Sequence, residues 1–447
     1  MVSRKAQARN ARCTFAARSR KTQQEPGRRW RGCIVRVRFM GSATRGKKTA
    51  IVIGCGIGGP VMAMALRRAG IEPVVYEAHD GSAHDVGSFL NTATNGLDAL
   101  RAIGVDGEVL AGGFPTPRMV MWSYTGKRLG EVANGVPLED GTVSITIKRG
   151  LLHRALRDEA VRRGIRIEHG KRLVDAEMVS DKVVARFEDG TQATGDLLIG
   201  ADGIHSRVRR IVDPSCPAPR YTGQLSIGGI ARGTSVAPTL DEYHMIFGKR
   251  AFFGYSVPPS GEAYWFANVA SEEAPTREAL AAISPEEWKR RLRALFAKDA
   301  GPAIEMIDGT GHELAAYPIY DIPTVRIWHR DAMVLVGDAA HATSPSAGQG
   351  ASLAIEDAVV LARCLRDMPD REQAFVAYER ARRARVEKVV QYSRRVGSSK
   401  VAGPIGRFFR DLMIPAALKL FAGSISHAWL YRYHIDWDEP MSAPSLR

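Results

Sequence analysis

The sequence contains no run of 18 or more apolar residues, which excludes a helix long enough to cross a membrane. Cysteine is scarce, with five in 447 residues, and none forms a CxxC pair or a zinc-ligand spacing. The odd number and irregular spacing favour a reducing cytoplasm without structural disulfides, and they predict no metal site. With 45% hydrophobic and 25% charged residues, the composition is that of a globular protein.

Acidic residues are nearly absent from the first 48 positions, where Glu25 stands against 15 lysines and arginines. The rest of the chain holds 48 basic and 47 acidic residues, so +14 of the net charge of +15 belongs to this extension. We expect residues 1–48 to be disordered. They have three interpretations: an organelle transit peptide, a nucleic-acid or membrane arm, or a segment upstream of a true start at Met40. We favour the last and expect neither a nucleic-acid partner nor membrane contact.

The pattern after residue 48 predicts an α/β protein with a βαβ opening. The apolar run 50–53 reads as a buried strand, followed by a helix to about residue 69 and a second strand at 72–76. Residues 214–325 are rich in Pro and Gly. They contain short aromatic strands, at 243–247, 251–257 and 263–269, which indicate a mixed or antiparallel sheet.

These patterns divide the chain into expected domains. Residues 49–213 and 326–400 would form one discontinuous domain, and residues 214–325 a second one that also takes up strands from near 115–145. Other elements expected are helices at 97–103, 150–163, 350–365 and 371–395, strands at 118–124, 142–148, 197–200 and 332–336, and a C-terminal helical segment, 401–447, with a helix near 405–421.

The first motif that carries chemistry is GCGIGG, residues 54–59, which fits GxGxxG between a strand and a helix. Glycines there permit a tight turn and close approach of the backbone to a pyrophosphate, which the helix N-terminus attracts. Glu77 ends the second strand, where a carboxylate can accept hydrogen bonds from a ribose. The motif predicts a dinucleotide, and by itself it leaves NAD and FAD open. Its residues are Gly54, Gly56, Ile57, Gly58 and Gly59.

A second motif, GADGIHSRVR, follows the buried strand 197–200. Asp202 and Gly203 stand at the end of that strand. From the residues alone, Asp202 has two equal interpretations, a ligand contact or a simple cap of the next helix.

The third motif is GDAAHATSPSAGQG, residues 337–350. Asp338 ends an apolar strand, where open α/β sheets bind ligands. Gly348, Gln349 and Gly350 open a further helix, whose free N–H groups can stabilise negative charge. The alternative is a structural strand–loop–helix turn.

These three motifs, in this order, resemble those of the single-component FAD-dependent aromatic monooxygenases, the para-hydroxybenzoate and salicylate hydroxylase family. The resemblance covers residues 49–400 and implies a Rossmann-like FAD-binding domain, a substrate domain and C-terminal helices. It implies hydroxylation of an aromatic or other electron-rich molecule with O2 through a flavin C4a-hydroperoxide, and NAD(P)H as a transient co-substrate. A monomer or homodimer is expected.

The resemblance also implies roles for individual residues. The glycines of the first motif would approach the FAD pyrophosphate, and Glu77 would bind the adenosine ribose. Arg149 would open a helix beside FAD, Asp202 and Gly203 would serve both nucleotides, and Asp338 would bind the ribityl chain. Pro345 and residues 348–350 would lie against the isoalloxazine. Two positions depart from the family pattern, Ser352 and Ala78.

A catalytic base is not identified by any motif. Four residues of the 214–325 segment are candidates by type and rough location only: His244, Tyr255, His312 and Tyr317. His341 is interpreted as a structural neighbour of the loop at 345–350, which the resemblance places against the flavin and which is called the flavin loop below. The alternative function is an FAD-dependent oxidoreductase of the same fold that does not hydroxylate: a reductase, a dehydrogenase or a halogenase. The last is disfavoured because the WxWxIP signature is absent.

Overall fold

Residues 49–76 form a strand, a helix and a second strand, as their pattern predicts. In the computed structural model, which describes residues 47–80, 89–311, 313–400, 411–416 and 427–441, they open a six-stranded sheet. Its order is β18-β19-β12-β1-β2-β8, and all neighbours are parallel except β18 and β19. The strands are β18 (His329–Arg330), β19 (Met333–Leu335), β12 (Leu197–Gly200), β1 (Thr49–Ile53), β2 (Glu72–Tyr76) and β8 (Arg166–Glu168). The predictions for residues 1–46 lie outside the described residues.

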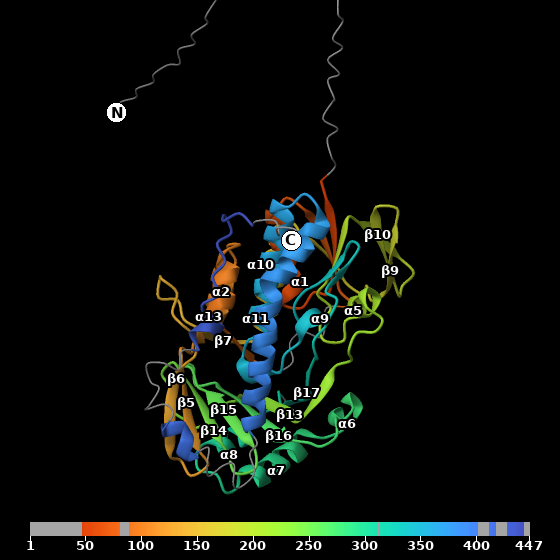
Figure 1. Ribbon diagram of the computed structural model, residues 1–447. Helices are drawn as coiled ribbons and strands as arrows, with labels where there is room; N and C mark the ends of the chain where they lie inside the picture. Colours follow the sequence, from red (N-terminus) through yellow and green to blue (C-terminus); the bar gives the residue numbers. More distant parts are fainter. Residues whose placement is uncertain (1–46, 81–88, 312, 401–410, 417–426, 442–447) are drawn as a thin grey trace, which may run out of the picture. The chain divides into compact units, whose positions relative to one another are not determined.

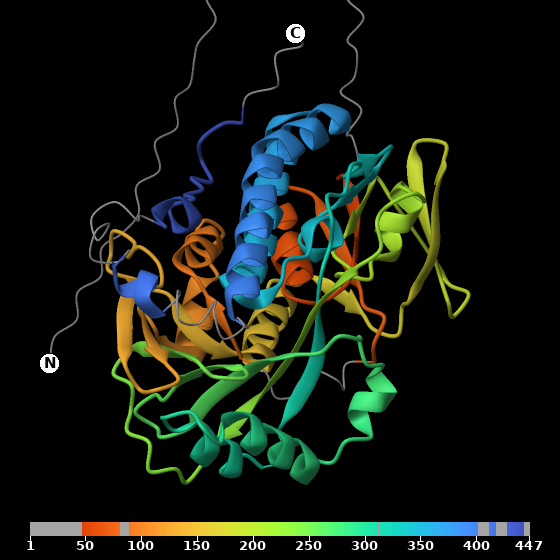
Figure 2. The same cartoon turned by 60° about the horizontal axis from the view of Figure 1, so that its bottom comes forward.

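Helices cover this sheet, because their apolar faces need a partner to bury them. α10 is buried along most of its length and packs against α1, α2 and α11. The two long helices, α10 and α11, run side by side in Figures 1 and 2. The helices around the sheet are α1 (Gly58–Arg68), α2 (Thr94–Arg101), α3 (Asp106–Gly112), α4 (Arg149–Arg162), α5 (Arg207–Val212), α9 (Asp338–His341), α10 (Gly350–Asp367) and α11 (Arg371–Lys400).

A seven-stranded sheet forms the second large layer, in the order β17-β13-β16-β15-β14-β5-β6. Neighbours are antiparallel except β14 and β5, which are parallel. The strands are β5 (Arg118–Ser123), β6 (Arg128–Ala133), β13 (Arg220–Ala231), β14 (Glu242–Phe247), β15 (Phe252–Ser256), β16 (Ala263–Ala270) and β17 (Ala315–Asp321).

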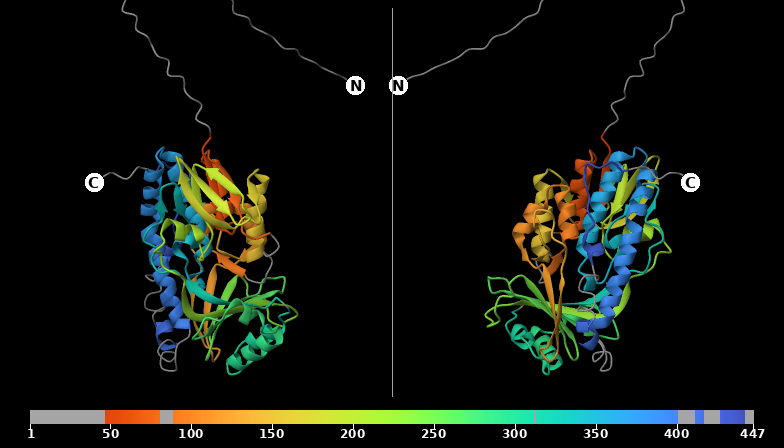
Figure 3. Two further views of the ribbon diagram at one scale, coloured as in Figure 1. Left: turned by 90° about the vertical axis from the view of Figure 1, so that its right-hand side faces the viewer. Right: turned by 60° about the vertical axis from the view of Figure 1, so that its left-hand side comes forward.

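The two faces of the seven-stranded sheet have different neighbours, because side chains alternate along each strand. Phe253, Trp265 and their neighbours pack against α7 and α8 in one hydrophobic cluster. Figure 3 shows these helices on one side of the sheet, and the six-stranded sheet and α11 on the other. The helices on the side of Phe253 and Trp265 are α6 (Arg277–Ala281), α7 (Pro285–Phe296) and α8 (Ala303–Asp308).

Two small antiparallel sheets complete the described chain. β9 (Leu173–Val179), β10 (Lys182–Phe187) and β11 (Gln192–Gly195) form a meander before β12. β7 (Ile145–Lys148) lies between β3 (Phe89–Thr92) and β4 (Gly113–Pro115). Residues 345–347 form the 3₁₀ turn η1 (Pro345–Ala347).

The C-terminal segment 427–441 is attached to the helices of the first sheet by hydrogen bonds to its backbone and by side chains buried in the main core, among them Leu430 and Trp437. Arg385 donates to the carbonyls of Trp429 and Leu430 at 2.9 Å, and Arg366 donates to the Trp437 carbonyl. Arg363 donates to the Glu439 carbonyl at 2.6 Å. Only α13 (Ala428–Tyr431) and residues 411–416 are helical among the described residues after 400.

The predicted fold class is confirmed, and the boundaries differ in places. The helix expected at 97–103 spans Thr94–Arg101, and the strand expected at 142–148 begins only at Ile145. The 12-residue strand β13 was not predicted, because its three glycines obscure the alternating pattern. Most of the helix expected near 405–421 lies outside the described residues. None of the described helices combines the length and the apolar character that a bilayer requires.

Candidate functional site

Four adjacent parallel strands bring the predicted motifs to one edge of the six-stranded sheet. β19, β12, β1 and β2 are neighbours in that order, so their carboxyl ends meet. Asp338 follows β19, Asp202 and Gly203 follow β12, the glycine loop 54–59 follows β1, and Glu77 follows β2. Neighbouring strands are about 4.8 Å apart, so segments nearly 300 residues apart in the chain line a single ligand-sized edge.

The glycine loop after β1 has the geometry that a bound pyrophosphate requires. Gly54 has φ +100°, and a Cβ there would lie 2.5 Å from the Ala201 carbonyl oxygen. A Cβ on Gly59 would lie 1.9 Å from the Gly54 oxygen, so both positions need glycine for internal packing. A Cβ on Gly56 would meet no protein atom within 4 Å. The middle glycine therefore faces the open side, where a phosphate can approach the backbone.

Two helices begin at this edge without side chains that satisfy their first N–H groups. The N-cap residues are Ile57 for α1 and Gln349 for α10, and neither makes a side-chain cap. Neither helix has an acidic residue in its first turn. Unsatisfied N–H groups and the helix dipole make these termini favourable for anionic groups of a ligand.

Glu77 is buried and fixed by the loop that it follows in the sheet. Its carboxylate accepts hydrogen bonds from the backbone N–H of Cys55 at 2.6 Å and of His79 at 3.0 Å. Two hydrogen bonds leave acceptor capacity on a carboxylate. The residue can therefore brace the glycine loop and still accept hydrogen bonds from a ribose.

The structure places Asp202 as a cap of α5. Its carboxylate accepts from the Ser206 hydroxyl at 2.6 Å and from the backbone N–H groups of Arg207 and Val208 at 2.7 and 3.1 Å. Burial raises the pKa of Asp202, and these hydrogen bonds oppose the rise. Gly203 has φ +76°, and a Cβ there would meet nothing within 4 Å. The backbone at Gly203, rather than the Asp202 carboxylate, is thus open to a ligand.

Arg209 joins the second motif to the third. Its guanidinium, fully buried, donates to the carbonyls of Ile204 at 2.7 Å and Ala339 at 2.9 Å. Burial lowers the pKa of Arg209. The side chain holds the two loops in register, and the sequence motifs alone did not single it out.

Asp338 begins α9 at the end of β19, with the backbone of Gly337 at φ +59°. Its side chain is accessible, yet the surrounding protein raises its pKa by desolvation, and the positive fields of His341 and Arg149 oppose that rise. Arg149, the first residue of α4, is exposed. The structure therefore brings the Arg149 charge into the field of Asp338, where the resemblance implies that both residues contact FAD.

Behind the third motif lies a network of buried charges, the α10–α11 ion network, defined here as Glu356, Asp357, Arg382, Arg385 and His341. Arg382 pairs with Glu356 at 2.6 Å and with Asp357 at 2.7 Å, and all three side chains are fully buried. Arg385 pairs with Glu356 at 2.8 Å, and His341 Nε2 lies 2.5 Å from Asp357. Burial alone would raise the pKa of Asp357, but His341 and Arg382 bring it well below its usual range.

This network fixes the two loops that flank the candidate flavin position. Asp357 accepts from the backbone N–H of Gly337 at 2.9 Å, one residue before Asp338. Asn95 donates to Glu356 at 2.6 Å and to Gln349 at 2.9 Å. Gln349 is fully buried, so its side chain belongs to this support rather than to a surface that a ligand could contact. His341 is placed as a structural residue of the loop.

The departure at Ser352 has a packing explanation. A Cβ added to Gly96 of α2 would lie 2.5 Å from the Ser352 hydroxyl, so α2 and α10 touch at this point. The hydroxyl accepts from the backbone N–H of Ala93 at 3.3 Å. Nothing in the structure explains the departure at Ala78.

The end of α11 connects the flavin loop to the seven-stranded sheet. A Cβ on Gly397 would lie 3.0 Å from the Ser346 hydroxyl, next to Pro345, and Gln224 of β13 donates to the Gly397 carbonyl at 3.1 Å. The sheet face that includes Ser226, Phe266 and Asn268 therefore lies beside the loop. Tyr317, in register with Ser226, is on this face and 42% exposed.

His244 and Tyr255 lie on the opposite face of that sheet. Tyr255 belongs to the cluster that packs against α7 and α8, and His244 Nδ1 is 2.8 Å from its hydroxyl. Glu242 is 3.1 Å from His244 Nε2. Burial lowers the pKa of His244 and raises the pKa of Tyr255 to about 12. Neither residue is brought to the strand-end edge, and His312 lies outside the described residues.

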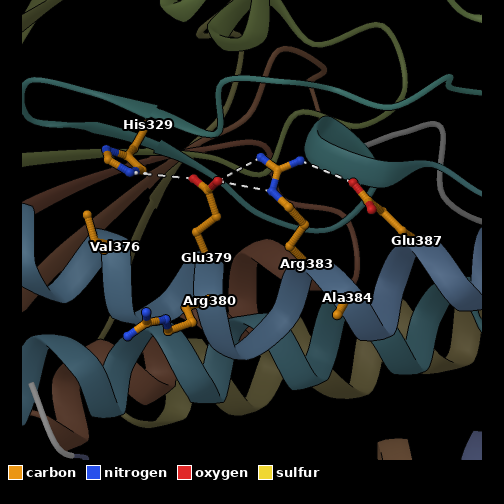
Figure 4. A pocket seen from close by; sticks show the side chains of 7 residues that line it. All are labelled: His329, Val376, Glu379, Arg380, Arg383, Ala384 and Glu387. Carbon is orange, nitrogen blue, oxygen red and sulfur yellow. Dashed lines mark hydrogen bonds and ion pairs between the residues drawn. The ribbon is translucent and has the colours of Figure 1, made fainter. Parts of the chain in front are cut away.

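A surface pocket of about 410 Å³ lies elsewhere, against the outer side of α11 and beside β18 (Figure 4). Most of its charged side chains pair with one another. Glu379 lies 2.8 Å from Arg383 and 3.5 Å from His329, and Arg383 is 3.2 Å from Glu387. This pocket contains none of the sequence motifs.

The residues that sequence reasoning missed are mainly the supports of the site: Asn95, Arg209, Arg382 and Arg385. One signal was available, because two consecutive acids, Glu356 and Asp357, stand between apolar residues in the first half of α10. Acids in such a position require buried cationic partners.

The comparisons with known proteins agree with this geometry. The family model described as "FAD binding domain" matches residues 47–393. The chain is 31% identical over 355 residues to aurachin C monooxygenase/isomerase of Stigmatella aurantiaca, covering 78% of this chain and 88% of the relative. It is 31% identical over 349 residues to the FAD-dependent urate hydroxylase of Klebsiella pneumoniae, covering 77% and 88%.

A solved structure shows the same architecture. Klebsiella pneumoniae HpxO complexed with FAD and uric acid superimposes with a TM-score of 0.73 at 27% identity. The match covers 85% of this chain and 96% of that protein.

Proposed function

This chain belongs to the family of FAD-dependent aromatic monooxygenases, and from this premise we propose that it uses NAD(P)H and O2 to hydroxylate an aromatic or other electron-rich small molecule. It is an FAD-dependent oxidoreductase. The observation that carries the proposal is the strand-end edge. There, three loops and the Glu77 carboxylate follow the adjacent strands β19, β12, β1 and β2. When bound, FAD supplies hydride acceptance and oxygen activation, and the protein supplies position and electrostatics.

We infer how the chain's own residues hold FAD. Gly54, Gly56, Ile57, Gly58 and Gly59 would receive the pyrophosphate at the N-terminus of α1, and Glu77 would accept from the ribose. Gly203 would contribute backbone and Asp202 would hold it by capping α5. Asp338 would bind the ribityl chain beside Arg149. Pro345 and residues 348–350 would support the ring, with the N–H groups of α10 stabilising negative charge on it.

The sheets also support a division of labour along the chain. We infer that residues 49–213 and 326–400 bind FAD, and that residues 214–325, with β5 and β6, form the substrate side. In support, every strand between 220 and 321 belongs to the seven-stranded sheet. We propose a cytoplasmic monomer or homodimer. The cysteines among the described residues, Cys55, Cys216 and Cys364, are all free.

The FAD site is tested by a matched pair of glycine variants. A side chain on Gly56 and one on Gly107 would both meet open space, but only Gly56 lies in the glycine loop. We expect Gly56→Val to weaken FAD binding at least about tenfold, the worth of roughly one hydrogen bond. Gly107→Val should leave it unchanged. Titration of the apoprotein with FAD measures both, and equal affinities would contradict the assignment.

The hydroxylation itself is tested with ¹⁸O2. Urate and 6-hydroxynicotinate are the first substrates to try, because relatives carry those names. We expect substrate-stimulated NAD(P)H oxidation and one ¹⁸O atom in the product. If the FAD-loaded protein oxidises NAD(P)H and no product carries the label, the alternative of a reductase or dehydrogenase of this fold replaces the proposal.

A further inference from the structure

The C-terminal end of α11 places a lysine on the sheet face beside the flavin loop. Lys400 lies one helical turn after Gly397, which contacts Ser346 of that loop. Its ammonium donates to Asn268 Oδ1 at 3.2 Å. The ammonium also lies 4.6 Å from the centre of the Phe252 ring and 5.4 Å from that of Phe266. Both rings and Asn268 belong to strands β15 and β16 of the seven-stranded sheet.

This cation is buried without a carboxylate. Lys400 is 7% exposed, and none of the acidic side chains in the described part of the chain pairs with it. Burial alone lowers the pKa of Lys400 to about 8. A buried ammonium normally requires an ionic partner or several acceptors, and the face of an aromatic ring is only a partial substitute.

Asn268 adds a second donor that lacks an acceptor. Its side chain is 1% exposed, and its Nδ2 has no hydrogen-bond partner among the described residues. The Lys400 ammonium and the Asn268 amide N–H groups lie next to each other and share one protein acceptor, Asn268 Oδ1. Such a group of donors can hydrogen-bond an anion that has several oxygen atoms.

The surroundings are suited to an aromatic ring that carries such a group. Asn268 is in register with Ser226 of β13, and Tyr317, in register with Ser226 on the other side, remains 42% exposed on the same face. Phe252 is buried in a small hydrophobic cluster, and Phe266 packs against it and is only partly buried. The two donors therefore lie on the sheet face that adjoins the flavin loop.

We propose that Lys400 and Asn268 form the subsite for a substrate carboxylate, so that the preferred substrates are aromatic acids. This assignment rests on the proposed hydroxylase function. The carboxylate accepts from both donors, which orients the ring between the loop at 345–350 and the sheet. The two residues bind and orient the substrate and transfer no proton.

The test compares acids with their neutral counterparts. The probes are hydroxybenzoates and the matching hydroxybenzamides, with the hydroxyl at ring position 2, 3 or 4. Binding to the FAD-loaded protein is followed through the visible flavin spectrum. We expect at least one hydroxybenzoate to bind the wild-type protein more tightly than its amide. We expect Lys400→Met to weaken that binding about 30-fold or more while the affinity for the amide changes little.

Three further variants separate charge from structure. Lys400→Arg keeps the charge and should retain most of the preference for acids. Asn268→Asp places a carboxylate beside Lys400 and should abolish that preference by neutralising the ammonium. Lys388→Met removes an exposed lysine of the same helix, which lies over the Trp429 ring, and should change nothing.

The outcomes distinguish this proposal from the function on which it rests. If the wild-type protein binds acids no more tightly than amides, or if Lys400→Met weakens both equally, the carboxylate subsite is overturned. If the protein takes up no FAD, the proposed function itself fails. FAD content and melting temperature of each variant show whether a loss of binding reflects a loss of fold.

Discussion

Two buried clusters of charge in this protein differ in one respect, which is whether the charges are paired. The α10–α11 ion network matches each of its carboxylates with an arginine or a histidine, and it holds Gly337 and Gln349 in place. The pair of Lys400 and Asn268 has a cation and no anion. We interpret the fully paired charges as a structural support of the site. We interpret the unpaired donors of Lys400 and Asn268 as a binding site for a ligand.

The largest effect is expected when the paired cluster loses one member. Arg382→Met leaves Asp357 and Glu356 buried with fewer partners, which costs about 3–5 kcal/mol for a buried pair. We expect a lower melting temperature and weaker FAD retention. Arg380→Met is the control, because Arg380 is exposed on the same helix. Thermal unfolding of the two variants measures the difference, and equal stabilities would remove the distinction between the clusters.

The unpaired cluster should respond in the opposite direction. Lys400→Met removes a buried cation, and we expect it to raise the free energy of unfolding at pH 7 by up to about 3 kcal/mol, since a pKa unit is about 1.4 kcal/mol. The buried Lys400 ammonium lowers the free energy of unfolding by its full amount at pH values below its lowered pKa of about 8. This loss becomes smaller as the pH rises toward 10.5, the ordinary pKa of lysine. The gain should therefore shrink between these values. Denaturant unfolding at pH 7 and pH 10 tests this, and a destabilised variant at pH 7 would contradict it.

Acid should weaken the paired cluster. The pKa of Asp357 is held well below its usual range, so its contribution is complete above about pH 4 and is lost as the pH falls toward the lowered value. We expect the free energy of unfolding to fall by on the order of 2 kcal/mol over this window, and Asp357→Asn to be less stable at pH 7 but less sensitive to acid. Stability curves for both proteins between pH 6 and pH 3 decide this, and parallel curves would refute it.

The smallest effect is expected on the far face of the seven-stranded sheet. Tyr255→Phe removes one hydrogen bond to His244 and should cost about 1 kcal/mol of stability. Because that face packs against α7 and α8, turnover of a substrate should stay within a factor of about three, less than 1 kcal/mol. A loss of turnover at unchanged stability would return Tyr255 to the list of catalytic candidates.

The sequence predicted the ligand-binding edge better than its supports. Local patterns mark Gly54, Glu77 and Asp338 because glycine turns and strand-end acids are short-range features. The pairing of Asp357 with Arg382, or of Lys400 with Asn268, joins residues that only the folded chain brings together. Likewise, aromatic strands were predicted at 243–247 and 251–257, but alternation alone did not show which face meets α7. His244 and Tyr255 were candidates for that reason.

The attachment of residues 427–441 has a consequence for how this region can vary. Arginines of α10 and α11 hold it by its carbonyl oxygens, and every amino acid supplies such an oxygen. The Glu439 side chain is 71% exposed, so it is freer to change between homologues than the number of residues from one arginine contact to the next. Insertions there should be selected against more strongly than replacements.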